Sequence, residues 1–144
     1  SFAGHAVIAC RFPVDVEFVV ASGCRWGKYL RDAYPEQVDR FEEQKPGDTH
    51  PTEVHVVRLG DIAITTNQFE LYTDYGMQMK ARSPALQTFV IQLTGPGTYL
   101  PTARGVQGGA YGSIPQRNTV GPEGGHVLVD RTVEMLDALW PKAK

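Results

Sequence analysis

Residues 53–66 read EVHVVRLGDIAITT, and this stretch decides the fold. Two runs rich in β-branched side chains, 53–59 and Ile62–Thr66, are separated only by Gly60 and Asp61. A two-residue connection that contains glycine is typical of a tight β-hairpin. The stretch therefore predicts a sheet that contains two adjacent antiparallel strands.

The residues that follow the hairpin predict a helix and then a strand. Asn67 is placed to cap a helix that runs over residues 69–82 and is ended by Ser83 and Pro84. Residues 88–93 read TFVIQL, a short and nearly all-apolar stretch that glycine and proline follow. Such a stretch is typical of a buried strand.

The C-terminal third joins a long loop to one more helix. Residues 94–126 are rich in glycine and proline, and loops of this length are usually functional. In residues 129–140 apolar side chains recur every three or four positions, which predicts a helix with one apolar stripe. His126 stands at its start, where a neutral imidazole can act as a cap, and Pro141 ends it.

The N-terminal part predicts further strands and helices. Residues 7–20 are rich in β-branched and aromatic side chains and indicate one or two strands broken at Pro13. Over residues 22–41 the apolar period becomes helical, with a break at Pro35, and residues 44–52 form a polar linker. The expected fold class is α/β or α+β: a mixed sheet with a hairpin, packed helices and long Gly/Pro-rich loops.

The composition fits a single domain over residues 1–144 and argues against several partners. Apolar residues make up 42% of the chain, which is enough for a core. The net charge of −2 gives no positive surface for nucleic acid. No apolar run approaches the ~20 residues that span a bilayer. Cys10 and Cys24 fit no zinc motif, and a disulfide and buried thiols stay open as alternatives.

Three side chains are candidates for chemistry. Glu70 follows the hairpin, but the pattern Asn67-x-x-Glu70 is typical of a helix cap, so a structural role is the alternative. Tyr99 and Tyr111 lie twelve residues apart in the glycine-rich loop. They are either exposed recognition residues or rings that cover the edge of the core. A phenol can also bind a metal ion or donate a hydrogen bond to an oxyanion.

The glycines and histidines give weaker indications. Residues 94–99, TGPGTY, follow a strand, but no Gly-Lys-Ser/Thr comes after them, which excludes a nucleotide site. The histidines lack the spacing HxH or HExxH, and His50 and His55 are expected to be solvated or packed. Only His5, in SFAGHAV, is surrounded like a buried metal ligand, with a packed core histidine as the alternative.

Several ordered motifs resemble one family. Residues 53–84, followed by TFVIQL, GTYLPT, GGAYG and GPEGGHVLVDRTVEML, resemble the C-terminal part of the catalytic domain of neutral/alkaline ceramidases. They look most like the bacterial ceramidase-like hydrolases. The resemblance covers about residues 53–140 and reaches weakly back to residues 40–45. It implies an amidase site built around one zinc ion, which two histidines, a glutamate and a tyrosine hold.

The resemblance gives a role to each candidate. The family's glutamate ligand follows a strand with the pattern R-x-G-x-x-A-I and stands six residues before a helical glycine, as Glu70 stands before Gly76. Its tyrosine ligand precedes a hydrophobic-x-Thr segment, which Tyr99 matches. A second tyrosine twelve residues on hydrogen-bonds the oxyanion, and Tyr111 has that position.

The histidine ligands match less closely. His5 corresponds to the histidine of a Phe-Ala-x-His-Pro segment, although Ala6 replaces the proline and His5 stands only 65 residues (70 − 5) before Glu70. The family's Thr-His-x-His segment has no counterpart in the sequence. A catalytic zinc uses about three protein ligands and a water. The chain is therefore expected to be a fragment of a larger ceramidase-like catalytic domain, without amidase activity of its own.

The resemblance thus implies part of a zinc-dependent amidohydrolase that cleaves a ceramide-like N-acyl amide into a fatty acid and an amine. A related metal hydrolase acting on another amide or an ester is a second interpretation. A non-catalytic α/β interaction or structural module without metal is the alternative from a different class. The implied partners are the lipid or amide substrate, the remainder of the catalytic domain and, peripherally, a membrane; the implied location is secreted or periplasmic.

Overall fold

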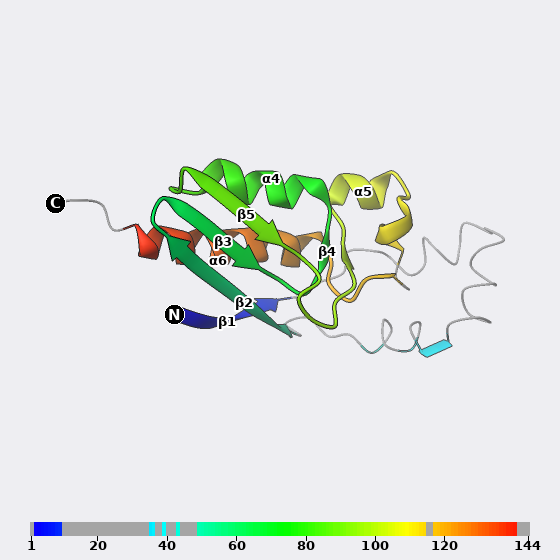
Figure 1. The fold of residues 1–144 in the computed structure, drawn as a ribbon. Coiled ribbons are helices and arrows are strands. Elements are labelled where there is room, and N and C mark those ends of the chain that lie inside the picture. The colour runs from blue at the N-terminus through cyan, green and yellow to red at the C-terminus, as the bar shows by residue number, and fades with distance from the viewer. Residues whose placement is uncertain are drawn as a thin grey trace.

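The computed structural model describes residues 2–9 (their backbone only), 35, 36, 39, 43, 49–114 and 117–140. Figure 1 shows the arrangement of their helices and strands. In chain order these are β1 (Phe2–Ala9), β2 (Thr49–Leu59), β3 (Ile62–Thr66), β4 (Glu70–Leu71), α4 (Thr73–Arg82), β5 (Gln87–Ile91), β6 (Tyr99–Leu100), α5 (Ala103–Gln107), the 3-10 turn η1 (Tyr111–Ser113) and α6 (Pro122–Leu139).

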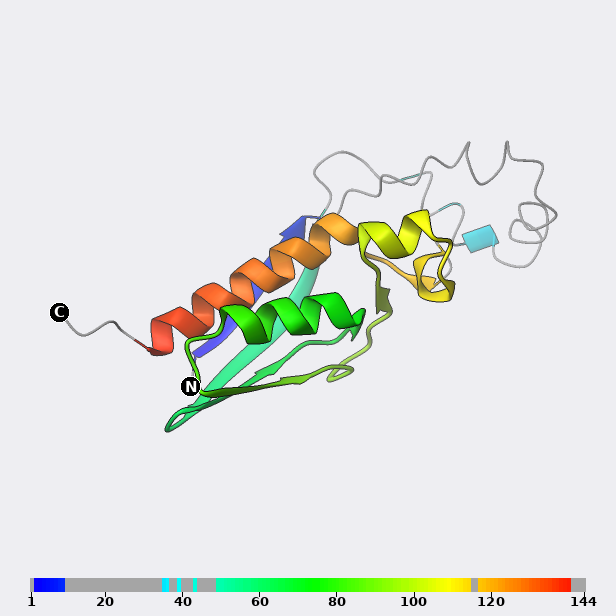
Figure 2. The same ribbon diagram turned by 90° about the horizontal axis from the view of Figure 1, so that it is seen from above.

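The described strands form one mixed sheet of four strands and one small sheet of two. The larger sheet has the order β1-β2-β3-β5, in which β2 runs antiparallel to β1 and to β3, while β5 runs parallel to β3. Helices α4 and α6 lie side by side on one face of this sheet, as Figure 2 shows. The predicted α/β fold class with a mixed sheet is confirmed.

The hairpin is confirmed and is tied to the far end of the chain. Gly60 adopts the left-handed φ of 62° that the tight connection requires. The Arg58 guanidinium donates to the backbone carbonyls of Gly60 and Leu139 and lies 4.4 Å from the centre of the Trp140 ring. The C-terminal end of α6 is thereby fastened to the turn between β2 and β3.

The core lies between the sheet and the two helices. Alternate residues of β2 and β3 point into it, and so do the apolar stripes of α4 and α6. The stripe predicted for the last helix is therefore confirmed. The buried apolar side chains are Val54, Val56, Ala63, Phe69, Tyr75, Met79, Leu100, Val120, Leu128, Val129, Val133 and Leu136.

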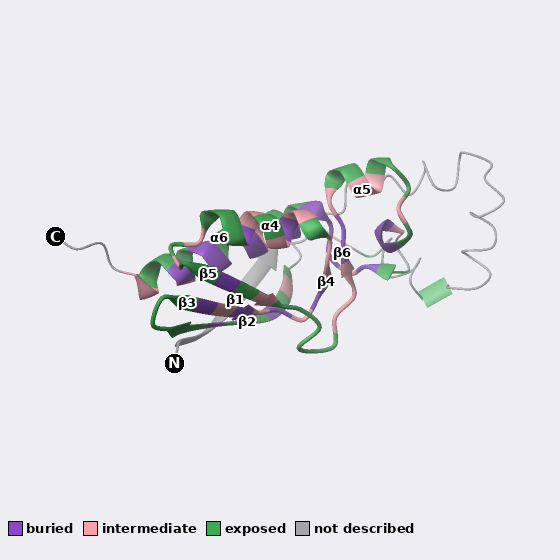
Figure 3. Ribbon diagram, turned by 45° about the horizontal axis from the view of Figure 1, so that its top comes forward, coloured by how far each residue is buried: buried purple, intermediate pink, exposed green. Residues whose placement is uncertain are grey.

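The opposite face of the sheet is apolar but exposed, as the green strand segments of Figure 3 show. In β5, Thr88 is buried, whereas Phe89 is 49% and Ile91 46% exposed. The strand predicted over residues 88–93 is confirmed as β5, but its predicted burial is wrong, because β5 is an edge strand that helices cover on one face only. A run of apolar residues cannot by itself distinguish the two cases.

The helix predicted over residues 69–82 begins later than expected. The Asn67 side chain does accept a hydrogen bond from the backbone N–H of Phe69 (3.0 Å), but it closes a turn and caps no helix. Glu70 and Leu71 then form β4, and α4 starts only at Thr73. The interpretation of Glu70 as a capping residue is therefore wrong.

Two predicted loops contain regular structure. β2 begins at Thr49, inside the predicted linker, because residues 49–52 pair with β1. The predicted loop over residues 94–126 holds β6, α5, η1 and the first residues of α6, whose Pro122 suits the first turn of a helix.

The predictions for residues 10–34, including Cys10 and Cys24, lie outside the described residues. Of the predicted helix over residues 22–41, residues 35, 36 and 39 are described, and they are helical. In the described part of the chain, no helix has the length and hydropathy to cross a membrane.

Candidate functional site

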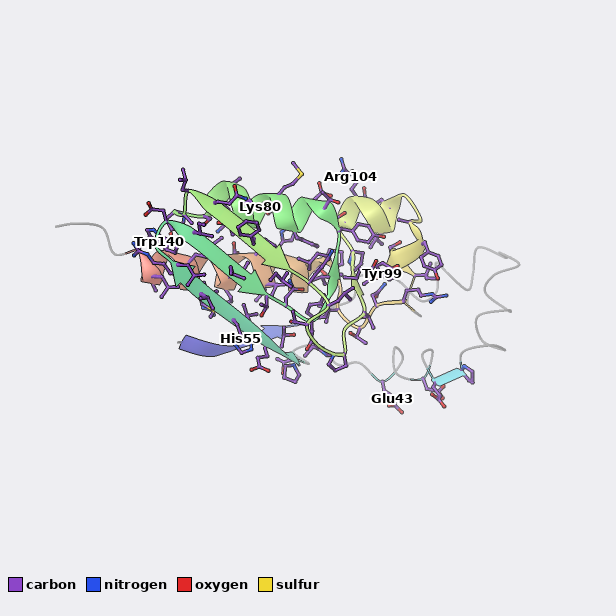
Figure 4. All side chains as sticks on the ribbon, in the orientation of Figure 1. Glu43, His55, Lys80, Tyr99, Arg104 and Trp140 are labelled. Carbon is purple, nitrogen blue, oxygen red and sulfur yellow. The ribbon has the colours of Figure 1, made fainter. Side chains whose placement is uncertain are left out.

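The two-stranded sheet brings Glu70 and Tyr99 together. β4 and β6 run parallel, and Glu70 is the direct neighbour of Tyr99 in their register. The backbone N–H of Glu70 donates to the backbone carbonyl of Thr98 (3.1 Å), and the N–H of Tyr72 donates to the carbonyl of Leu100 (3.2 Å). Figure 4 labels Tyr99 at the end of the molecule opposite Trp140, away from the hairpin.

A short strand forms at β4, where backbone N–H groups have acceptors outside any helix. The N–H of Leu71 donates to the side-chain oxygen of Gln92 (2.7 Å), and the carbonyl of Phe69 accepts from the N–H of Leu93 (3.3 Å). The buried Phe69 ring anchors the same segment in the core. Glu70 therefore stands on a fixed piece of backbone between the large sheet and α4.

The phenol of Tyr99 interacts with the carboxylate of Glu70. Burial of the hydroxyl group raises the pKa of Tyr99 above its usual value near 10; a hydrogen bond to Glu70 and its negative charge raise it further, and Tyr111 adds to the effect. Arg117 lowers the same pKa through its positive charge. The raised pKa favours the protonated phenol of Tyr99 beside the half-buried side chain of Glu70.

Tyr111 completes a cluster with Tyr99. The two rings meet edge to face, with centroids 6.0 Å apart and planes at 83°. A side chain at Gly112 would place its Cβ atom 2.7 Å from the Tyr99 ring, so the turn that carries Tyr111 can approach Tyr99 only with glycine there. The Tyr111 side chain itself is exposed.

Hydrogen bonds fix the loop around this cluster. The side-chain amide of Asn118 donates to the backbone carbonyls of Gly112 (3.2 Å) and Ile114 (2.8 Å). The hydroxyl of Thr98, next to Tyr99, accepts from the backbone N–H of Thr119 (3.0 Å). The turn η1 and strand β6 are thereby held against each other through the segment that follows them.

The structure brings together three of the four predicted site residues, Glu70, Tyr99 and Tyr111. His5 lies in β1 of the larger sheet, directly opposite Glu53 in the register, and not in the sheet of β4 and β6. Within the part of the chain that the structure describes, no group of three or more His, Cys, Asp and Glu side chains could hold a metal ion. Glu70 and Tyr99 together offer two oxygen groups, whereas a zinc ion takes about four ligands.

One charged member of the cluster was missed in the sequence. The guanidinium carbon of Arg117 lies 4.7 Å from the centre of the Tyr111 ring, where the positive charge meets the face of the ring. A single arginine in a loop carries no periodic or spacing signal, so nothing in the sequence distinguishes it from a solvated side chain. Only the folded turn places it beside Tyr111.

Comparison of the chain with protein-family models, with curated proteins and with solved structures finds no match.

Proposed function

We propose that the chain is part of a zinc-dependent amidohydrolase acting on N-acyl amides of the ceramide type, in which Glu70 and Tyr99 are two of the metal ligands. The observation that carries the proposal is the pairing of a carboxylate with a phenol, 29 residues apart (99 − 70), as direct neighbours across β4 and β6. The order and spacing of the motifs around them resemble ceramidases, which supports the assignment.

The donor set fits part of a catalytic zinc site. Carboxylate oxygens are established zinc ligands, and a phenolate oxygen is likewise anionic and hard. The remaining ligands would come from residues other than those described in 49–114 and 117–140, with His5 as a candidate. We accordingly expect these 144 residues to bind zinc through Glu70 and Tyr99 but to show no amidase turnover.

The reaction breaks the C–N bond of the amide, forms a C–O bond from water and leaves the proton on the departing amine. When bound, the zinc supplies an acidified water and polarises the amide carbonyl. Glu70 and Tyr99 would hold the ion at the edge of the small sheet. The exposed phenol of Tyr111 would donate a hydrogen bond to the oxyanion that develops on the carbonyl oxygen.

Zinc affinity tests the proposal directly. The apparent Kd is measured by competition with a chromophoric chelator for the wild-type chain, Glu70→Gln and Tyr99→Phe. Each substitution should weaken zinc binding at least about tenfold, since even loss of a residue that supports a ligand has an effect of that size. Glu134→Gln is the matched control: Glu134 is exposed on α6 and pairs with Arg131, and its loss should leave zinc affinity unchanged.

Two outcomes would argue against the proposal. Equal zinc affinities for the wild type, Glu70→Gln and Tyr99→Phe would remove the metal site and favour a non-catalytic α/β module. Robust amide hydrolysis by the 144 residues alone would contradict the expected shortage of ligands. A panel of N-acyl amides and esters, tested with the complete catalytic domain, separates ceramidase activity from that of a related hydrolase.

A further inference from the structure

Arg117 differs from the other described arginines in having no hydrogen-bond acceptor for its guanidinium within the described part of the chain. Three of the others form ion pairs with carboxylates, and the fourth donates to backbone carbonyls. These partners are Asp130 for Arg82, Asp74 for Arg104, Glu134 for Arg131, and the carbonyls of Gly60 and Leu139 for Arg58.

The position of Arg117 is nevertheless fixed by its surroundings. Its backbone N–H donates to the carbonyl of Ile114 (2.9 Å), and the next residue, Asn118, donates to that same carbonyl. Its guanidinium carbon lies over the Tyr111 ring at 4.7 Å. Contact with a ring leaves the N–H groups at the edge of a guanidinium able to bind an acceptor in its plane.

One aromatic ring links the guanidinium to the proposed metal ligands. The Tyr111 ring that supports it packs edge to face on Tyr99, which is paired with Glu70. Arg117 thus lies at the edge of the site, and its guanidinium has no hydrogen-bond acceptor among the residues that the structure describes.

We propose that Arg117 binds a carboxylate of the ligand beside the Glu70–Tyr99 pair; the proposal rests on the proposed function. The fork of the guanidinium matches a carboxylate with two parallel hydrogen bonds. A singly charged carboxylate also suffers less repulsion from Glu70 than a doubly charged phosphate would. Amide hydrolysis offers two sources: the fatty acid that is released, or a carboxylate on the amine half, as in an N-acyl amino acid.

Titration calorimetry with the 144-residue chain tests the proposal without zinc or turnover. The ligands are dodecanoate, N-dodecanoylglycine and the neutral N-dodecanoylethanolamine, each below its micelle-forming concentration. Arg117→Gln should weaken carboxylate binding roughly ten- to a hundredfold, as expected for the loss of a charged hydrogen-bond pair. It should leave the neutral amide unaffected. Arg104→Gln is the matched control, because Arg104 is exposed and paired with Asp74.

The two carboxylates distinguish the sources. A loss confined to dodecanoate assigns Arg117 to the released acid, a loss confined to N-dodecanoylglycine assigns it to the amine half, and a loss of both supports binding of either. Arg117→Lys keeps the charge without the fork and should recover only part of the affinity. Equal binding by the wild type and Arg117→Gln, or no preference of the wild type for carboxylates, overturns the proposal.

A measurement on the wild type alone guards against a variant that fails to fold. Carboxylate affinity should fall as sodium chloride is raised from 50 to 500 mM, because an exposed charge pair is screened over a Debye length of ~10 Å at 0.1 M. Salt-independent affinity overturns the proposal. If Glu70→Gln leaves zinc binding unchanged while Arg117→Gln weakens carboxylate binding, only the proposed function fails. If Glu70→Gln weakens zinc binding while Arg117→Gln leaves carboxylate binding unchanged, only the role of Arg117 fails.

Discussion

Tyr75 lies in the core and Tyr99 in the candidate site, and their hydroxyl groups have different surroundings. Tyr75, on α4, is fully buried, and its hydroxyl lies within hydrogen-bond distance of the backbone carbonyls of Pro101 (2.9 Å) and Pro122 (3.1 Å). Tyr99, in β6, is only partly buried and is paired with the carboxylate of Glu70. A neutral carbonyl deep in the fold fixes a structure, whereas a carboxylate near the surface can exchange its partner for a ligand.

The two regions are nevertheless joined through the backbone. Pro101 directly follows β6, and Pro122 is the first residue of α6, so the Tyr75 hydroxyl holds α4 between the site strand and the last helix. We therefore expect substitutions around Tyr75 to lower the stability of the whole fold. Substitutions around Tyr99 should change metal affinity with little effect on stability.

The largest loss of stability is expected from Leu136→Ala. Leu136 is fully buried in α6, and removing its side chain leaves a cavity between the helix and the sheet, at a cost of about 2–5 kcal/mol. Leu86→Ala, at an 85% exposed position, is the control and should change stability by less than about 0.5 kcal/mol. Urea unfolding measures both; similar losses for the two variants would show that the helix does not cover the core as described.

A smaller loss is expected from Gly125→Ala in the same helix. A Cβ atom at Gly125 would overlap the ring and hydroxyl of Tyr75, so the substitution should cost about 1–3 kcal/mol through overpacking. Gly76→Ala, in α4, is the matched control because nothing lies within 4 Å of its Cβ position. Alanine there should raise stability by up to about 1 kcal/mol, through its higher helix propensity. A neutral Gly125→Ala would contradict the close contact of Tyr75 with α6.

Features that depend on residues close together in the sequence could be predicted, whereas features that depend on contacts between distant segments could not. The hairpin and the apolar stripe of α6 were predictable because a glycine turn and a 3.6-residue period are local signals. The exposure of Phe89 was not, since it depends on which face of β5 the helices cover. β4 was missed because two residues have no period, and the turn at Asn67 uses the same side-chain hydrogen bond as a helix cap.

For the site, the resemblance named Glu70, Tyr99 and Tyr111, and the structure brings these three residues together. Their zinc ligation stays a prediction. The composition and periodicity of the sequence could not have paired Glu70 with Tyr99, because the strand β6 that carries Tyr99 is also only two residues long. Arg117 had no local signal at all.

Tyr75→Phe should have the next largest effect on stability, and this effect should depend on pH. At pH 8 the loss of the hydroxyl should cost about 0.5–1.5 kcal/mol. Burial, with the charges of Glu123 and Asp74, raises the pKa of Tyr75 above the unfolded value near 10. A raised pKa stabilises the folded state fully below about pH 10, and this contribution is lost as the pH rises further.

Urea unfolding of the wild type and of Tyr75→Phe at pH 8, 10 and 11.5 measures the difference. The wild type should lose more stability than the variant between pH 10 and 11.5, so the two curves converge as the pH rises. The slope that remains in the variant includes the contribution of Tyr99, whose pKa is raised by burial and by Glu70. Parallel curves would show that the Tyr75 phenol is solvated in the folded state.

Gly112→Ala should have the smallest effect on folding stability but a large effect on zinc affinity. The added Cβ atom would stand 2.7 Å from the base of the Tyr99 ring, so the ring must turn aside. Because the ring is only partly buried, this should cost about 1 kcal/mol, the low end of the range for overpacking. The phenolic oxygen moves with the ring, so zinc affinity should fall about ten- to a hundredfold. Gly76→Ala, six residues after Glu70, is the control and should leave zinc affinity unchanged. Unchanged zinc affinity in Gly112→Ala, with the fold intact, would show that the position of the Tyr99 ring does not govern metal binding.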